Sequence, residues 1–292
     1  MRTLLKKSFA YIGIDINRFI QVISKFSIYL ALFQNGQREL LKKLRAIVPD
    51  ISNQESSKAS TFNDYWELKR RALQAFQCDM MLKALEKIRG GKKEVTVVDI
   101  GDSAGTHMLY LKELTKDRFD IKTVSVNLDP RAIKKIEARG LKAMLCRAED
   151  IDLGDKKVDI FTSFQMVEHL HNPVIFFRRL AKKSLGDRMV VTVPYLRRSR
   201  VGLPYIRNKS RQHVCAEEVH IFELNPKDWN LIFLHAGWRV VYNEFYYQYP
   251  RHIPLISTFF SWFWRSTDYE GFWGAILIKD TEFADLYTDW TE

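Results

Sequence analysis

The chain has 292 residues, of which 46% are hydrophobic and 28% charged, and this composition is that of a folded globular protein. Its three cysteines form no CxxC pair, which argues against a disulfide framework and a structural zinc site and favours a reducing cytoplasm. The formal net charge of +11 predicts an anionic partner, such as nucleic acid, an acidic membrane surface or an acidic or phosphorylated substrate.

The N-terminal part predicts an amphipathic helix. From Ile16 to Phe33 apolar residues recur at helical spacing, and charged residues interrupt them. A spanning helix needs roughly 20 mostly uncharged residues, so we expect this helix to lie on the main domain, on a second copy in a homodimer, or on an anionic membrane. We find no signal-peptide pattern, so we expect a cytoplasmic protein, with peripheral contact at the inner membrane as the alternative. The membrane alternative is supported by the basic residues of the segment, Arg2, Lys6, Lys7, Arg18 and Lys25.

The next segments divide the chain. Residues 49–64 are polar and poor in aromatic side chains, which is typical of a linker or mobile loop. A helical pattern follows from Tyr65 to Ile88 and ends at two glycines. We therefore predict an N-terminal extension over 1–48, a linker over 49–64 and one domain over 65–292.

That domain alternates strand and helix patterns, which predicts an α/β fold with a doubly wound, mostly parallel seven-stranded sheet and an antiparallel terminal strand. Strand patterns lie at Val95–Ile100, Lys122–Asn127, Lys142–Cys146, Val158–Ser163, Arg188–Val193, Trp238–Tyr247 and Phe272–Ile278, the last two as a hairpin-like pair. Helix patterns lie at His107–Leu114, Pro130–Arg139 and Pro173–Lys183, and another helix ends at Ala236.

The first strand runs into a turn of small residues, Gly101 to Gly105, and then into a helix. Glycine lets the backbone approach a ligand closely, and the free N–H groups of a helix start can face polar ligand atoms. In open α/β sheets, ligands bind at the carboxyl ends of the strands, where this turn lies. The turn lacks the GxGxxG spacing of a pyrophosphate-binding dehydrogenase.

Five ordered motifs resemble those of the class I S-adenosylmethionine-dependent methyltransferases, in particular the group related to ubiquinone-pathway and bacterial glycan-tailoring enzymes. The resemblance covers about Val95 to Lys279. The motifs are the glycine turn DIGDSAG, the strand end VSVNLDP, the acidic turn RAED, the loop SFQMVEHLHNP and the strand end VTVPY. The resemblance implies a Rossmann-like fold and S-adenosyl-L-methionine as the cofactor.

The resemblance also implies the cofactor-binding residues. Asn127 stands where the family has an acid that accepts from both ribose hydroxyls, so either Asn127 keeps one contact or Asp129 reaches back. Asp129 equally suits a cap of the helix that begins at Pro130, and Glu149 equally suits a solvated acidic turn. The implied set is Asp99, Gly101, Asp102, Ser103, Gly105, Asn127, Leu128, Asp129, Ala148, Glu149, Phe164 and Gln165.

Three residues are candidates for acid–base chemistry at the acceptor. We expect His220 to be the general base, with His169 or Glu168 as the alternatives, although His220 equally suits a buried structural histidine. A basic run between Arg197 and Arg211 supplies six positive charges, which either bind an anionic acceptor or form a solvated face. The spacing of histidine, cysteine and acidic residues demands no metal.

The sequence therefore predicts a methyltransferase that acts on an oxygen of a sugar or surface-glycan precursor. Methylation of a lipid or quinone-like hydroxyl is the alternative, for which the aromatic segment Phe259 to Trp264 would line an apolar acceptor pocket. A non-catalytic cofactor-binding module is a further alternative. We find no stacking motif of a known nucleic-acid-binding type, so no nucleic-acid partner is expected.

Overall fold

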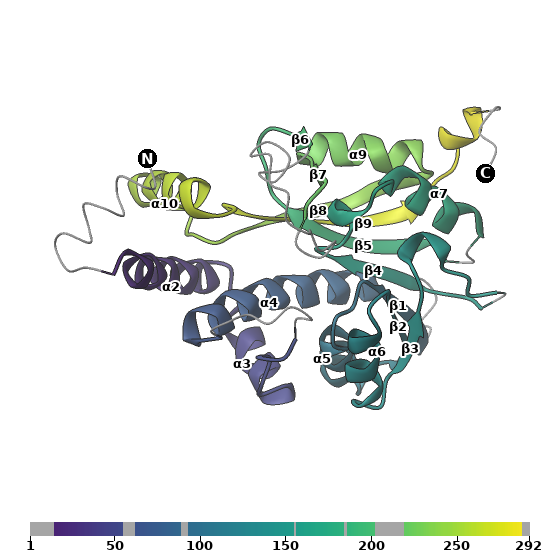
Figure 1. Cartoon of the computed structure of the whole chain (residues 1–292), viewed down its shortest axis with the longest axis horizontal. Coiled ribbons are helices and arrows are strands. Elements are labelled where there is room, and N and C mark those ends of the chain that lie inside the picture. The colour runs from purple at the N-terminus through teal and green to yellow at the C-terminus, as the bar shows by residue number, and fades with distance from the viewer. Residues whose placement is uncertain are drawn as a thin grey trace.

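The structure is a computed structural model, and it describes residues 15–54, 62–88, 93–154, 156–183, 186–201 and 219–287. Its centre is a seven-stranded sheet in the order β3-β2-β1-β4-β5-β9-β8, and a two-stranded pair, β6 and β7, lies beside it (Figure 1). The strands are β1 (Glu94–Ile100), β2 (Asp120–Asn127), β3 (Lys142–Leu145), β4 (Ile160–Phe164), β5 (Arg188–Pro194), β6 (Arg200–Val201), β7 (Phe222–Glu223), β8 (Trp238–Tyr247) and β9 (Gly271–Lys279).

The predicted fold class is confirmed. Strands β1 to β5 pair in parallel, and β9 runs antiparallel to both of its neighbours, β5 and β8. The expected hairpin-like pair is present as adjacent strands, but a helix of the aromatic segment connects them instead of a tight turn. That helix, α10 (Pro254–Thr267), was not among the predicted elements.

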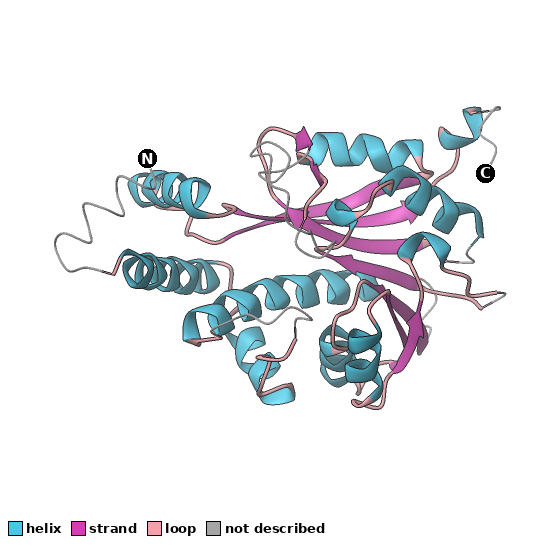
Figure 2. Ribbon diagram, in the orientation of Figure 1, coloured by secondary structure: helices cyan, strands magenta, loops and turns pink. Residues whose placement is uncertain are grey.

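Helices cover both faces of the sheet (Figure 2). Side chains alternate across a strand, so Val97 and Val98 of β1 enter different hydrophobic cores. The core on one face includes α4, α5 and α6, and the other includes α7 and α9. The helices are α2 (Ile16–Gln34), α3 (Arg38–Ile47), α4 (Asp64–Glu86), α5 (Thr106–Thr115), α6 (Pro130–Glu137), α7 (Pro173–Lys183) and α9 (Pro226–His235), with 3₁₀ turns η1 (Ala148–Asp150), η2 (Val167–His169) and η4 (Ala284–Leu286).

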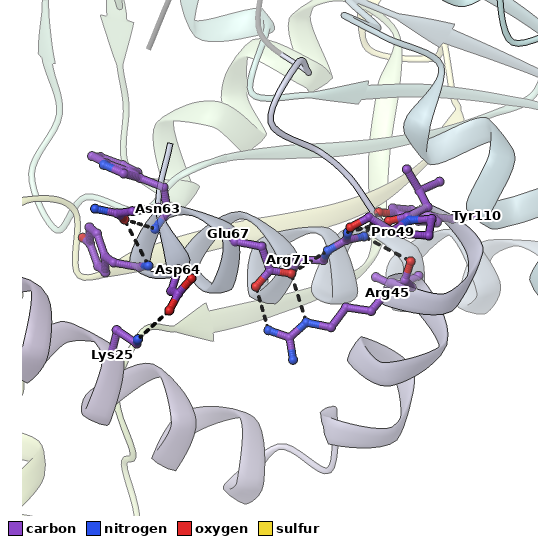
Figure 3. Close-up of polar contacts among 12 residues, drawn as sticks. Lys25, Arg45, Pro49, Asn63, Asp64, Glu67, Arg71 and Tyr110 are labelled. Atoms are coloured by element: carbon purple, nitrogen blue, oxygen red, sulfur yellow. Dashed lines mark hydrogen bonds and ion pairs between the residues drawn. The ribbon is translucent and has the colours of Figure 1, made fainter. Parts of the chain in front are cut away.

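The N-terminal helices pack on α4, whose first turn is capped by the Asn63 side chain. A buried arginine of α4, Arg71, joins these segments (Figure 3). Its guanidinium pairs with Glu67 and donates to the Tyr110 hydroxyl on α5. It also donates to backbone carbonyls of α3 and the following turn, those of Leu44, Val48 and Pro49. The α3 segment is therefore held by a charge in the interior as well as by apolar contacts.

Helices α2 and α10 lie together at one end of the molecule, away from most of the sheet (Figure 1). Ser27 of α2 donates to the carbonyl of Gln248 (2.7 Å) and accepts from the indole N–H of Trp264 on α10 (3.0 Å). By length and composition α2 could cross a membrane, a test that a core helix or a signal sequence also passes. The basic residues expected at positions 2, 6 and 7 lie outside the described residues.

Candidate active site

A cavity of about 600 Å³ opens at the carboxyl ends of β1, β2 and β4, which is the place predicted for a ligand. This volume is within the usual range of small-molecule sites, about 300–1,000 Å³. Ten of the twelve predicted cofactor residues line it: Asp99, Gly101, Asp102, Ser103, Asn127, Leu128, Ala148, Glu149, Phe164 and Gln165. Gly105 and Asp129 are not among the lining residues.

Two glycines of the first turn are required by its geometry. Gly101 has φ +91°, and a Cβ there would lie 2.5 Å from Cγ of Met166. Gly105 has φ +73°, and a Cβ there would lie 2.5 Å from Cδ1 of Leu141. Neither position has room for a Cβ atom. Gly101 therefore lets the turn pack directly against Met166, and Gly105 lets α5 begin close to Leu141.

Asp102 organises the turn with its own side chain. Its Oδ1 accepts from the backbone N–H groups of Ala104 (3.0 Å) and Gly105 (2.7 Å), and its Oδ2 accepts from the Ser125 hydroxyl (2.7 Å). Both carboxylate oxygens are thus used within the protein. This use favours a structural role in shaping the loop over a direct contact with the cofactor, which the resemblance implied for Asp102.

Asp99 differs, because one of its oxygens has no partner. Its Oδ1 accepts from the Thr162 hydroxyl (2.7 Å), whereas Oδ2 is buried without a hydrogen-bond partner among the described residues. Burial and the nearby Asp102 carboxylate raise the pKa of Asp99 well above its ordinary value. A cationic or donor group of a ligand in the cavity would satisfy this oxygen.

The end of β2 is tied to the glycine turn. The Asn127 amide donates to the Asp102 carbonyl (2.9 Å), and its oxygen accepts from the N–H of Asp129 (2.8 Å). Asp129 caps α6 through the N–H of Arg131 and also pairs with the Arg131 guanidinium. Asp129 therefore caps helix α6, which was one of its two expected roles. Asn127 and Leu128 line the cavity.

The loop after β4 forms the opposite wall. Gln165 has φ +54°, a left-handed conformation that is uncommon outside glycine and is often found at functional sites. Two hydrogen bonds to Thr192 hold it there, from the Gln165 N–H to the carbonyl (2.9 Å) and from Nε2 to the hydroxyl (3.2 Å). The strained residue places Phe164 and Gln165 in the cavity lining, as the sequence predicted.

The sequence reasoning missed a third wall, made by α4 and the start of α5. Arg70, Gln74 and Gln77 of α4 line the cavity at a spacing that keeps them on one helix face. His107 lines it too, and burial lowers its pKa to about 4, so its ring is neutral and pairs with the Gln77 amide oxygen (2.8 Å). The available signal was this polar stripe on a helix that is otherwise mostly buried.

The three predicted acid–base residues meet at the edge of the cavity. His169 lines it, and the rings of His169 and His220 stand nearly perpendicular to each other, with 4.6 Å between ring centroids. One ligand-capable atom of each of Glu168, His169 and His220 lies within 4.8 Å of the others. Glu168 is buried, and neither of its carboxylate oxygens has a hydrogen-bond partner among the described residues. A ligand cluster could not be expected from the sequence, because His220 lies about 50 residues away along the chain from Glu168 and His169.

Hydrogen bonds orient both imidazole rings. Nδ1 of His169 contacts the carbonyl of Val219 (2.9 Å), which fixes this nitrogen as the donor. Nδ1 of His220 lies 2.9 Å from the Tyr269 hydroxyl, whose own proton is donated to Glu223. Nδ1 of His220 is therefore also a donor, so in the neutral form of either ring the lone pair would be on Nε2.

The pKa values of the groups in and beside this cluster are shifted in different directions by burial and by neighbouring charges. Burial raises the pKa of Glu168 to about 7. Burial lowers the pKa of His220, but the hydrogen bond to Glu223 and the charge of Glu168 outweigh it, and the net pKa is raised. Burial also opposes the charge on Glu223, yet bonds from His220, Arg200 and Tyr269 lower its pKa to about 2.

The predicted basic segment is partly described. Arg197 pairs with the buried Glu270 (2.8 Å), and Arg200 pairs with the buried Glu223. These two positive charges are thus compensated inside the protein and serve the local structure. Residues 202–218 of the segment lie outside the described residues.

Comparison with known proteins agrees with this fold. Residues 98–183 match the family described as "Methyltransferase domain". A structure of the Burkholderia thailandensis 1,6-didemethyltoxoflavin-N1-methyltransferase with S-adenosylhomocysteine superposes with a TM-score of 0.51 at 13% identity, covering 74% of this chain and 81% of that one. A SAM-dependent methyltransferase from Aquifex aeolicus has 16% identity and a TM-score of 0.45, with 82% and 98% covered. No curated protein sequence matches the chain.

At 13% identity the likeness to the Burkholderia thailandensis structure establishes the fold alone, and the domain match over residues 98–183 gives the activity and its cofactor, S-adenosyl-L-methionine. The cavity suits this cofactor. The glycine turn brings backbone against the ligand, Asp99 offers an orphaned acceptor for an ammonium group, and Phe164 offers a ring edge or face to the apolar part.

Proposed function

We propose that this chain is a class I S-adenosylmethionine-dependent methyltransferase that methylates an oxygen of a sugar or surface-glycan precursor. The observation that carries the proposal is the cluster of Glu168, His169 and His220 at the edge of the cofactor cavity. The sulfonium methyl is already activated, so the protein has to hold the acceptor oxygen, the methyl carbon and the sulfur in line. A hydroxyl acceptor also needs help with its proton, which is worth about 10² to 10⁴ in rate.

Polar side chains within a mostly apolar cavity lining support a polar acceptor over a lipid or quinone. Arg70 and Gln74 supply charged and hydrogen-bonding groups beside the predicted cofactor residues. The alternative required the aromatic segment to line an apolar acceptor pocket, but none of the described lining residues comes from α10. Phe259 and Trp262 of α10 are instead about half exposed.

We propose that the acceptor is anionic. Arg70 and Arg147 line the cavity, and guanidinium groups bind carboxylate and phosphate oxygens by paired hydrogen bonds. Arg147 is largely exposed and lies 3.7 Å from Glu149, so its ion pair is weak and open to exchange with a ligand. The net charge of +11 would raise the local concentration of such an acceptor.

The exposed faces of α2 and α10 support peripheral contact with an anionic membrane. On α2 the exposed apolar residues recur on one face, opposite the buried Ser27 and Ile28. The two helices lie side by side, with the rings of Phe26 and Phe260 6.5 Å apart (Figure 1). Basic side chains that could face anionic lipid are close in sequence, at Arg18, Lys25, Arg251 and Arg265. The apolar set is Phe19, Val22, Phe26, Tyr29 and Phe33 on α2, and Leu255, Ile256, Phe259 and Trp262 on α10.

The acceptor proposal is tested by transfer of the labelled methyl group. The full chain would be incubated with S-adenosylmethionine and, separately, with nucleotide sugars, lipid-linked anionic glycans and long-chain catechols. Product mass and the released S-adenosylhomocysteine would be measured. We expect a methylated glycan. Methylation of the catechols alone would overturn the proposal, and tight S-adenosylhomocysteine binding without any turnover would identify a non-catalytic module.

The membrane proposal is tested by co-sedimentation with vesicles of phosphatidylglycerol and of phosphatidylcholine. We expect binding to the anionic vesicles, reduced by Phe259→Ser with Trp262→Ser and unaffected by Phe283→Ser, an exposed aromatic residue elsewhere. A protein that ignores both vesicles but elutes as a dimer, and becomes monomeric in the double variant, would show that this face joins two copies.

A further inference from the structure

We propose that Glu168, His169 and His220 bind a divalent first-row transition cation, such as Zn²⁺ or Mn²⁺, which contacts the acceptor hydroxyl. The site is assembled by the fold. Glu168 and His169 lie in the turn η2 after β4, and His220 precedes β7. The N–H of Ile221 donates to the Glu168 carbonyl (2.8 Å), which fastens the two segments together.

The first argument is the unsatisfied carboxylate. Glu168 is 1% exposed, and both of its oxygens are buried without a hydrogen-bond partner among the described residues. A buried carboxylate with no partner costs several kcal/mol, and proteins avoid this situation by supplying a counter-charge or a metal ion. The two histidines beside it supply lone pairs, which complete the ligand set of a cation.

The second argument is the orientation of the imidazoles. A metal-binding histidine usually donates its other ring N–H to a carbonyl or carboxylate, which fixes the tautomer. His169 does so through Nδ1 to the Val219 carbonyl, and His220 does so through Nδ1 to Tyr269, with Glu223 3.4 Å away. Tyr269 in turn donates to Glu223, and Arg200 holds the other Glu223 oxygen. These outer hydrogen bonds fix the orientation of both rings and the tautomer in which Nε2 would bind the cation.

The third argument is the donor set and its spacing. Two histidines and one carboxylate suit zinc, manganese or iron rather than calcium or magnesium, which prefer oxygen ligands. Donor atoms on one tetrahedral zinc lie about 3.4 Å apart, given bond lengths near 2.1 Å. The three donors already lie within 4.8 Å of one another, so small side-chain rotations suffice.

The position of the site would let the cation contact the acceptor hydroxyl, and here the inference rests on the proposed function. Three protein ligands leave positions open for water or substrate, and His169 faces the cavity. Contact with the cation would lower the pKa of the acceptor hydroxyl, so that the hydroxyl could lose its proton to water closer to neutral pH. The oxygen then forms a bond to the methyl carbon while the carbon–sulfur bond breaks and its electron pair stays on sulfur. The product is a methyl ether with S-adenosylhomocysteine, and the cation is unchanged.

The test measures cation binding directly. Untagged full-length protein would be treated with chelator, dialysed and titrated with Zn²⁺ by calorimetry and with Co²⁺ by visible absorption, with Mg²⁺ as the comparison ion. We expect one transition ion per chain, weak or no binding of Mg²⁺, and the absorption of a four- or five-coordinate Co²⁺ site. Glu168→Gln and His220→Gln should abolish the signal while S-adenosylhomocysteine still binds.

Two variants separate a built site from general surface binding. Glu223→Gln should weaken Zn²⁺ binding about 10–100-fold, because it changes the Tyr269–Glu223 pair that orients His220 and leaves the three proposed ligands in place. His235→Gln is the matched control, since His235 likewise pairs with a tyrosine hydroxyl, that of Tyr287, but lies on α9. Its Zn²⁺ affinity should equal that of the wild type.

The outcomes separate this inference from the proposed function. Loss of Zn²⁺ binding in His235→Gln, or retention in both Glu168→Gln and His220→Gln, would overturn the cation site. Stoichiometric binding without methylation of any tested acceptor would leave the site standing and refute the acceptor. Full methylation by protein shown to be free of transition metal would refute the cation's part in the reaction.

Discussion

Replacing Arg71 by methionine tests the account of how the N-terminal helices are held (Figure 3). The guanidinium is fully buried, and it bonds to Glu67, to the Tyr110 hydroxyl and to three carbonyls. Removing one partner of a buried charge pair destabilises by about 3–5 kcal/mol. Glu67 keeps its bond to Arg45, and methionine fills much of the volume, so we expect the lower limit, about 3 kcal/mol.

The assay is denaturant and thermal unfolding of the full chain. At about 2 °C per kcal/mol, the value for larger domains, the midpoint should fall by about 6 °C. Arg45→Met is the matched control, because it pairs with the same carboxylate near the surface and should change stability by about 0–1 kcal/mol. An Arg71→Met midpoint within 1 °C of the wild type, or equal losses in the two variants, would refute the reasoning.

Other changes probe the site and the pH response. Gly101→Val should abolish S-adenosylhomocysteine binding because its Cβ meets Met166, whereas Gly140→Ala, at a similar φ with open space, should keep it; equal affinities by calorimetry would refute the assigned turn. Gln165→Gly should relieve about 1 kcal/mol of backbone strain and so raise the unfolding midpoint slightly. It should also weaken cofactor binding, because Gln165 lines the cavity. A lower unfolding midpoint would contradict this reasoning. Burial raises the pKa of Glu67, but bonds from Arg45 and Arg71 outweigh it and lower the pKa, so its stabilisation is present above the pKa of the unfolded chain and lost as pH falls through the folded value. Glu67→Gln should accordingly be less stable than wild type near neutrality, and the difference should shrink in acid; a constant difference in unfolding free energy across that range would count against it.

The sheet could be predicted because its signals are local. Apolar runs such as Val95 to Ile100, followed by turn residues and helical spacing, depend only on neighbouring residues, and parallel alternation leaves few topologies. The glycine turn was recognised for the same reason, since a left-handed backbone at Gly101 and Gly105 requires a residue without a Cβ. The helix α10 was not predicted, because it lies between two strands for which the sequence predicted a hairpin-like connection.

The site needed the tertiary structure where its parts come from distant segments. The sequence identified Glu168, His169 and His220 separately, but only the fastening of β7 to η2 brings the three donors within 4.8 Å. The wall made by Arg70, Gln74 and Gln77 was likewise invisible, because its relation to the cavity depends on how α4 packs on the sheet. By itself, then, the sequence determined the strands, the glycine turn and the cofactor, through local backbone rules and hydrophobic periodicity. The tertiary structure alone decided which polar side chains share one cavity, because long-range packing sets their distances.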